Sequence, residues 1–140
     1  MAGGFRAAVE LLRGLDLKDR ERILKEMAQS DPALVEELRH NFITLEDFKD
    51  LTPLMLHELI KTATPERMAT ALRLAPPALQ EQLLNNTTKT LRATLEEILH
   101  GPPLPVAQVQ KAYQELMDVC EQMAQEGKII INPQGKDQLV

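Results

Sequence analysis

The residues of this sequence that could support catalysis or bind a metal are few and widely separated. The three histidines are His40, His57 and His100, and none has a second histidine or a cysteine at a ligand spacing such as i+4 on a helix. The single cysteine, Cys120, falls on an apolar helical stripe, where a buried thiol is inert. These patterns predict no metal, no cofactor and no catalytic cysteine.

Adjacent carboxylates are the remaining candidates for chemistry, and they occur at Glu36-Glu37, Glu46-Asp47 and Glu96-Glu97. Acid–base catalysis would require one member of a pair to be desolvated. All three pairs lie off the apolar stripes, which favours solvated charge. Because the sequence also has no glycine-rich loop after a strand and no Gly-x-Ser-x-Gly motif, we expect no enzymatic activity.

Composition favours a soluble helical protein. Of the 140 residues, 44% are hydrophobic and only 3% are aromatic, so the core must be built from Leu, Met, Ile, Val and Ala, and a β-sandwich is disfavoured. The net charge is -5 without a basic cluster, which argues against nucleic-acid binding. No apolar run approaches the roughly 20 residues that would allow direct membrane insertion, and a lone cysteine suits a reducing cytosol.

Three helices are expected in residues 1–41, after a flexible entry at Gly3 and Gly4. The first helix is indicated by apolar residues at a spacing of three and four, which are Phe5, Ala8, Val9, Leu12 and Leu15. A second should run from Lys18 to Gln29 with Asp16 as its cap. A third should begin at Asp31-Pro32 and end near His40.

A short apolar stretch, Phe42-Ile43-Thr44-Leu45, is interpreted as a hinge at residues 42–45, and a brief helical turn is expected to follow through Leu51. Beyond it, helix-start signals recur about every 12 residues. They are Thr52-Pro53, Thr64-Pro65, Pro76-Pro77 and Thr87-Thr88. Four short helices are predicted, each too short to be stable alone, so they must stack into a superhelix or a compact orthogonal bundle.

A long last helix is predicted from Val106 to Gln125, after the break at Gly101-Pro102-Pro103-Leu104-Pro105. Gly127 should end it as a C-cap. The run from Lys128 to Ile131 is the one strand-like segment, and residues 132–140 are expected to form a flexible tail.

Several short motifs occur in the order and spacing of a known family. They are Arg22-Ile23-Leu24, Asp31-Pro32-Ala33-Leu34, Phe42 to Asp47, Ala71-Leu72-Arg73, Asn86-Thr87-Thr88-Lys89, Gly101-Pro102 and Glu126-Gly127-Lys128-Ile129. From Gly3 to Val140 the chain resembles the C-terminal region of the bacterial flagellar motor switch family FliG. The resemblance implies an all-α, right-handed superhelix with an armadillo-like segment at 1–41, the hinge, and a helical subdomain at 46–131.

The same resemblance implies a function and partners. In that family this region is the rotor face of the motor switch, which contributes to torque and to the direction of rotation. The implied partners are the cytoplasmic loop of a MotA-like stator, the switch protein FliM and neighbouring copies in a ring. The implied location is cytoplasmic and peripheral, at the flagellar basal body of the inner membrane.

A charged ridge helix at residues 88–99 would meet the stator. With Leu91, Leu95, Ile98 and Leu99 inward, the predicted stator-facing residues are Arg73, Lys89, Arg92, Glu96 and Glu97. Some family positions differ. Aligned on the apolar residues, the ridge has Thr90 where the family has an arginine, and Glu97 with Ile98 where it has an acidic pair. Sliding the alignment by one residue restores Lys89 and the pair Glu96-Glu97 but puts Thr94 and Leu95 out of register. In either register Leu104 stands where the family has a second arginine. Thr44 and Phe42 also depart from the family hinge. These departures leave open a non-flagellar helical adaptor with the same fold.

Overall fold

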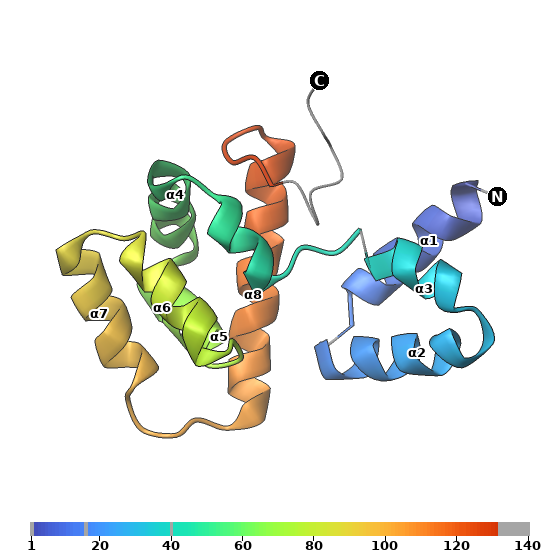
Figure 1. The fold of residues 1–140 in the computed structure, drawn as a ribbon, viewed down its shortest axis with the longest axis horizontal. Coiled ribbons are helices and arrows are strands. Elements are labelled where there is room, and N and C mark those ends of the chain that lie inside the picture. Colours follow the sequence, from blue (N-terminus) through green and yellow to red (C-terminus); the bar gives the residue numbers. More distant parts are fainter. Residues whose placement is uncertain (1, 16, 40, 132–140) are drawn as a thin grey trace. The chain divides into compact units, whose positions relative to one another are not determined.

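The regular structure of this protein is entirely helical. The computed structural model describes residues 2–15, 17–39 and 41–131, and within these ranges it contains eight α-helices, one 3₁₀-helix and no strand (Figure 1). The predicted all-α fold is therefore confirmed. The chain divides into two compact units between Phe42 and Ile43.

The first unit holds three helices, α1 (Ala2–Arg13), α2 (Leu17–Ser30) and α3 (Pro32–Arg39). Their shared core consists of Val9, Leu12, Leu24, Val35, Leu38 and Phe42. Asp31 begins α3, because its Oδ1 accepts a hydrogen bond from the Leu34 amide at 3.1 Å. The flexible entry expected at Gly3 and Gly4 is wrong, since both lie within α1. The packed apolar face that follows offsets the weak helix propensity of glycine. Asp16 and His40 lie outside the described residues.

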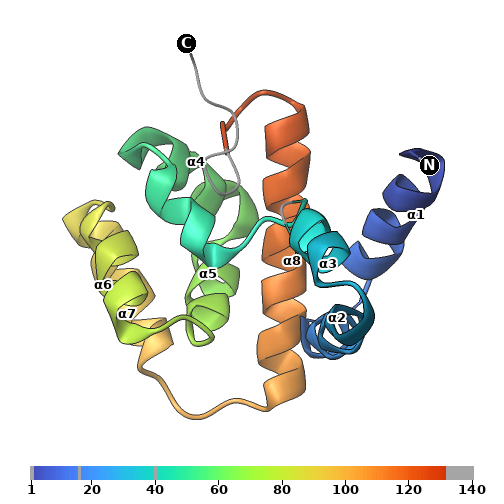
Figure 2. The same cartoon turned by 45° about the vertical axis from the view of Figure 1, so that its right-hand side comes forward.

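The second unit begins with η1 (Leu45–Asp50), a 3₁₀-helix that packs against α6. The four short helices that follow are α4 (Pro53–Ala63), α5 (Pro65–Leu72), α6 (Pro77–Asn85) and α7 (Lys89–Leu99). Helix α5 packs against both α7 and the long α8 (Val106–Gln125), and α4 also packs on α8 (Figure 2).

Threonine caps explain why these helices begin where they do. The hydroxyl oxygens of Thr52, Thr64 and Thr88 accept hydrogen bonds from the backbone N–H three residues later, at 3.1, 3.3 and 3.2 Å. Proline at the first position of α4 and α5 loses no hydrogen bond there. Three of the four helix starts that recur about every 12 residues are thus capped by threonine, whereas α6 follows Pro76, whose side chain cannot act as a cap.

Helix α8 ends in a Schellman motif at Gly127, whose φ is 76°. The Lys128 amide donates to the Met123 carbonyl at 2.9 Å, and the Gly127 amide donates to the Ala124 carbonyl at 3.1 Å. The strand-like run that follows is not a strand, because no described segment pairs with it. Ile129 is buried instead. The predicted tail at 132–140 lies outside the described residues.

Candidate functional site

The candidate site is α7, the predicted ridge. Its inner face holds Leu95 and Leu99, which are buried, while Leu91 and Ile98 are half-buried. Of the residues of this helix expected outward, Lys89 and Glu97 are exposed, and Arg92 and Glu96 are half-buried. The helix therefore turns a charged face to solvent, in the orientation that the apolar spacing predicted.

Arg92 lies at the centre of a polar network that joins α7 to α6. Its Nε donates to Glu96 Oε1 at 2.9 Å, and its Nη2 donates to Glu81 Oε1 at 2.7 Å. Nη1 donates to the side-chain oxygen of Asn85. The hydrogen bonds that Arg92 donates to Glu81 and Glu96 raise the pKa of Arg92 above its ordinary value. This guanidinium is therefore largely satisfied within the chain.

Arg73, at the C-terminal end of α5, reaches the far end of α7. Its Nη2 donates to the Ile98 carbonyl and its Nη1 to the Pro102 carbonyl, both at 2.9 Å. Its Nε is buried without a hydrogen-bond partner within the described structure. A Cβ at Gly101 would be in ordinary contact with Arg73 Nη2, at 3.6 Å, and tight only against the Ile98 carbonyl oxygen, at 3.3 Å. The guanidinium of Arg73 thus connects α5 to the last turn of α7 and to the loop that follows, an arrangement called the Arg73 clamp below.

Two ridge charges stay available to a partner. Lys89 and Glu97 are exposed, and neither makes an ion pair in the described part of the chain. Glu96 shares one oxygen with Arg92 and is only partly available. Of the five residues predicted to face a stator, Arg73 and Arg92 are held by internal contacts, and Lys89, Glu96 and Glu97 are the ones that present charge outward.

The predicted hinge residues contribute to both units. Phe42 is buried in the core of the first unit, where the Arg20 guanidinium lies 4.5 Å from its ring centroid. Leu45 is buried in the second unit, and Ile43 and Thr44 are half-buried. The Asp47 carboxylate accepts a hydrogen bond from the Thr44 amide at 2.9 Å and fixes the start of η1. A swing about residues 42–45 stays a prediction.

The described residues contain no group of three or more His, Cys, Asp or Glu side chains that could hold a metal ion. His57 and His100 are exposed, and Cys120 is fully buried. Burial raises the pKa of the Cys120 thiol to about 12, with smaller contributions from Glu121 and Asp47, so the thiol is protonated at neutral pH.

None of the helices in the described ranges combines the length and the apolar character needed to span a lipid bilayer.

These features define a helical domain whose most distinctive surface is a clamped, charged helix. The sequence matches the family described as the FliG C-terminal domain over residues 25–131, and the chain belongs to that family. It is 32% identical to the flagellar motor switch protein FliG of Aquifex aeolicus over 129 residues, covering 91% of this chain and 39% of that protein. It is 25% identical to the FliG of Thermotoga maritima over 139 residues, covering 99% of this chain and 42% of that protein.

Solved structures agree with this assignment. The structure of full-length FliG from Aquifex aeolicus matches with a TM-score of 0.55 and 30% identity, over 91% of this chain and 40% of that one. A crystal structure of FliG from H. pylori matches with a TM-score of 0.64 and 21% identity, over 90% of this chain and 60% of that one, and supports the fold alone. The chain spans about two fifths of the length of the two relatives compared by sequence.

The internal partners of the ridge are what sequence reasoning missed. The contact between Arg92 and Glu96 has the i,i+4 spacing that a helix makes visible in sequence. Glu81, Asn85 and the carbonyls bound by Arg73 gave no such signal, because they come from other elements and depend on how α5, α6 and α7 pack.

Proposed function

We propose that this chain is the rotor-side segment of a flagellar motor switch, and that α7 is the surface that meets the stator. The observation that carries the proposal is the match to the FliG C-terminal domain across residues 25–131. The exposed charges on α7 support the choice of surface. The expected partners are the cytoplasmic loop of a MotA-like stator, the switch protein FliM and neighbouring copies in a ring, at the cytoplasmic face of the basal body. Its role would be mechanical rather than enzymatic.

The available charge favours a contact through few residues. Exposed ion pairs contribute about 0–1 kcal/mol each and are screened beyond roughly 8 Å at physiological salt. With Lys89, Glu96 and Glu97 presenting charge, such a contact would be weak and transient. A weak contact suits a surface that must engage and release a stator repeatedly.

A helical adaptor outside the flagellum is the second candidate. The observation that favours it is that Arg73 and Arg92 are engaged within the chain, which leaves a sparse charged face. Leu104 is half-buried where the resemblance implies an arginine.

Deletion of the gene in the organism that encodes it separates the two candidates. A motor-switch role predicts that swimming in soft agar is lost and that a plasmid copy of the gene restores it. An adaptor role predicts normal swimming. Normal swimming of the deletion strain, or a genome without flagellar stator and rod genes, would overturn the first proposal.

A further inference from the structure

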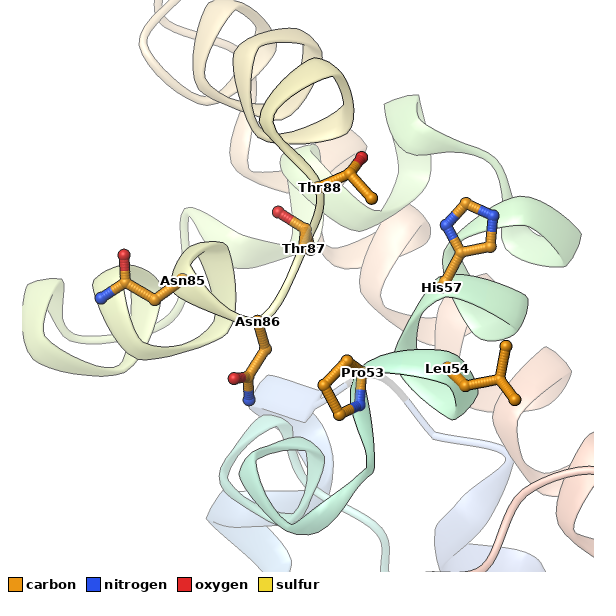
Figure 3. Close-up of a pocket in the computed structure, with 7 residues that line it drawn as sticks. All are labelled: Pro53, Leu54, His57, Asn85, Asn86, Thr87 and Thr88. Carbon is orange, nitrogen blue, oxygen red and sulfur yellow. The ribbon is translucent and has the colours of Figure 1, made fainter.

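A groove on the second unit lies beside the start of the ridge. Some of its lining residues also make contacts within the chain, such as Asn85 with Arg92 and Thr88 as the cap of α7. The larger hollow of the groove has a volume of about 460 Å³. Pro53, Leu54 and His57 of α4 line one side, and residues 85–88, from the end of α6 to the start of α7, line the other (Figure 3). A second hollow of about 250 Å³ shares the lining residue His57 with the first.

The groove has an apolar strip along α4 and α7 between polar edges. The second hollow is lined by His57, Ile60, Lys61, Pro65 and Leu91. Leu54 is 71% exposed, which makes it one of the most exposed large apolar side chains among the described residues. An isolated exposed leucine is ordinary. One that forms the wall of a groove is a candidate anchor point for a partner.

The length of the groove along α4 matches about two turns of a helix. The residues of α4 that line it run from Pro53 to Lys61, which at 1.5 Å per residue is a length of about 12 Å. A partner helix laid along that length would place apolar residues at i, i+3 or i+4, and i+7 over the groove.

The charges around the groove favour a partner helix with acidic residues on both sides of its apolar face. No Asp or Glu lines either hollow, although the chain as a whole carries a net charge of -5. Lys61 lines one hollow and Lys89 follows directly on the lining residue Thr88. No described carboxylate pairs with either lysine. Glu58 is exposed on α4 but does not line the groove.

We propose that this groove docks an amphipathic helix of a partner protein, with acidic residues on both sides of its apolar face. Leu54 and Leu91 would contact the apolar face, and Lys61 and Lys89 would pair with the acidic flanks. The proposal goes beyond the ridge function, because its anchors on α4, Leu54 and Lys61, lie outside the ridge, although Lys89 and Leu91 belong to α7. Its test does not depend on motility.

The test uses three synthetic 15-residue helical peptides with one identical leucine face and flanks of Glu, Gln or Lys. Each peptide is titrated into the full chain, and backbone amide shifts are followed by NMR. Binding should shift amides of residues 54–61 and 86–91, and the Glu peptide should bind at least tenfold more tightly than the Lys peptide. No shift with any peptide, shifts confined to other surfaces, or equal affinity of the Glu and Lys peptides would overturn the proposal.

Two variants locate the site, with a matched control. Leu54→Glu should weaken the Glu peptide at least tenfold, and Lys61→Glu should reverse the preference toward the Lys peptide. Val106→Glu changes a side chain of similar exposure, 67%, outside the groove and should leave affinity unchanged. Equal effects of the Leu54 and Val106 variants would contradict the assignment. Self-association of the free chain that Leu54→Glu abolishes would show that a second copy is the occupant, which would also overturn it.

Discussion

Replacement of Arg73 by methionine should loosen the C-terminal end of the ridge helix without disturbing its start. Methionine keeps a long apolar side chain but cannot donate the hydrogen bonds that Arg73 makes to the Ile98 and Pro102 carbonyls, each 2.9 Å long. Two such bonds contribute about 1 kcal/mol each where the donor is half-exposed. The free energy of local opening should therefore fall by about 2 kcal/mol.

Amide hydrogen exchange is the appropriate assay, because it reports opening residue by residue. The His100 amide donates to the Glu96 carbonyl and the Gly101 amide donates to the Ile98 carbonyl, so both report on the clamped turn. They should exchange about 30-fold faster in Arg73→Met, which corresponds to 2 kcal/mol. The Arg92 amide, which donates to the Thr88 carbonyl at the other end of α7, should change little.

Two further substitutions make the result specific. Arg73→Lys should lose about half as much stability, because an ammonium group cannot span both carbonyls as a planar fork does. Lys89→Met removes an exposed cation without an ion pair among the described residues and should stay within about 0.5 kcal/mol of the wild type. Unchanged exchange at His100 and Gly101 in Arg73→Met would refute the clamp.

Three other features give predictions about stability, and each prediction has its own control or pH dependence. Gly127→Ala should destabilise the protein by about 1 kcal/mol in urea unfolding because φ there is 76°, whereas Gly4→Ala, with open space around the new methyl group, should stabilise α1. Thr88→Ala should cost about 1 kcal/mol through the lost cap of α7, and Thr90→Ala, an exposed position on the same helix, should cost nothing. Burial raises the pKa of Cys120 to about 12, so the unfolded thiol ionises first. Stability should fall above about pH 8.5 by up to about 1.4 kcal/mol per pH unit, and Cys120→Ala should lack that component of the decline.

Local signals in the sequence were sufficient to place most of the helices. Proline at a first helical position and a threonine cap act within three or four residues, so the starts of α4 and α5 could be predicted from neighbours alone. Helix α8 runs from Val106 to Gln125 as its apolar spacing predicted, and Gly127 closes it. The buried residues of α8 recur every three or four positions, and that pattern can be read from the sequence alone.

Contacts between elements could not be predicted in the same way. Arg73 donates hydrogen bonds to carbonyls 25 and 29 residues away in the sequence. Glu81 of α6 accepts a hydrogen bond from Arg92 of α7, 11 residues further on. Nothing in the spacing of these residues indicates that the chain brings them together. The sequence predicted five charged residues for the ridge. It could not distinguish those that make contacts within the chain from those that are exposed to a partner.

The charged residues of the ridge would therefore serve the proposed function in two different ways. Arg73 and Arg92 would support the ridge from within, and their loss should act through the position and stability of α7. Lys89 and Glu97 would act at the surface, where charge reversal alters a contact without altering the fold. The two groups are therefore distinguishable, because only the first should change amide exchange in α7.

The most direct test of the proposed rotor role is the torque of single tethered cells that carry Lys89→Glu or Glu97→Lys in the chromosomal gene. The proposal predicts that both strains assemble flagellar filaments and that torque falls in each, while the purified variants unfold at the same urea concentration as the wild type. Full torque in both strains would contradict the claim that the exposed charges of α7 meet the stator.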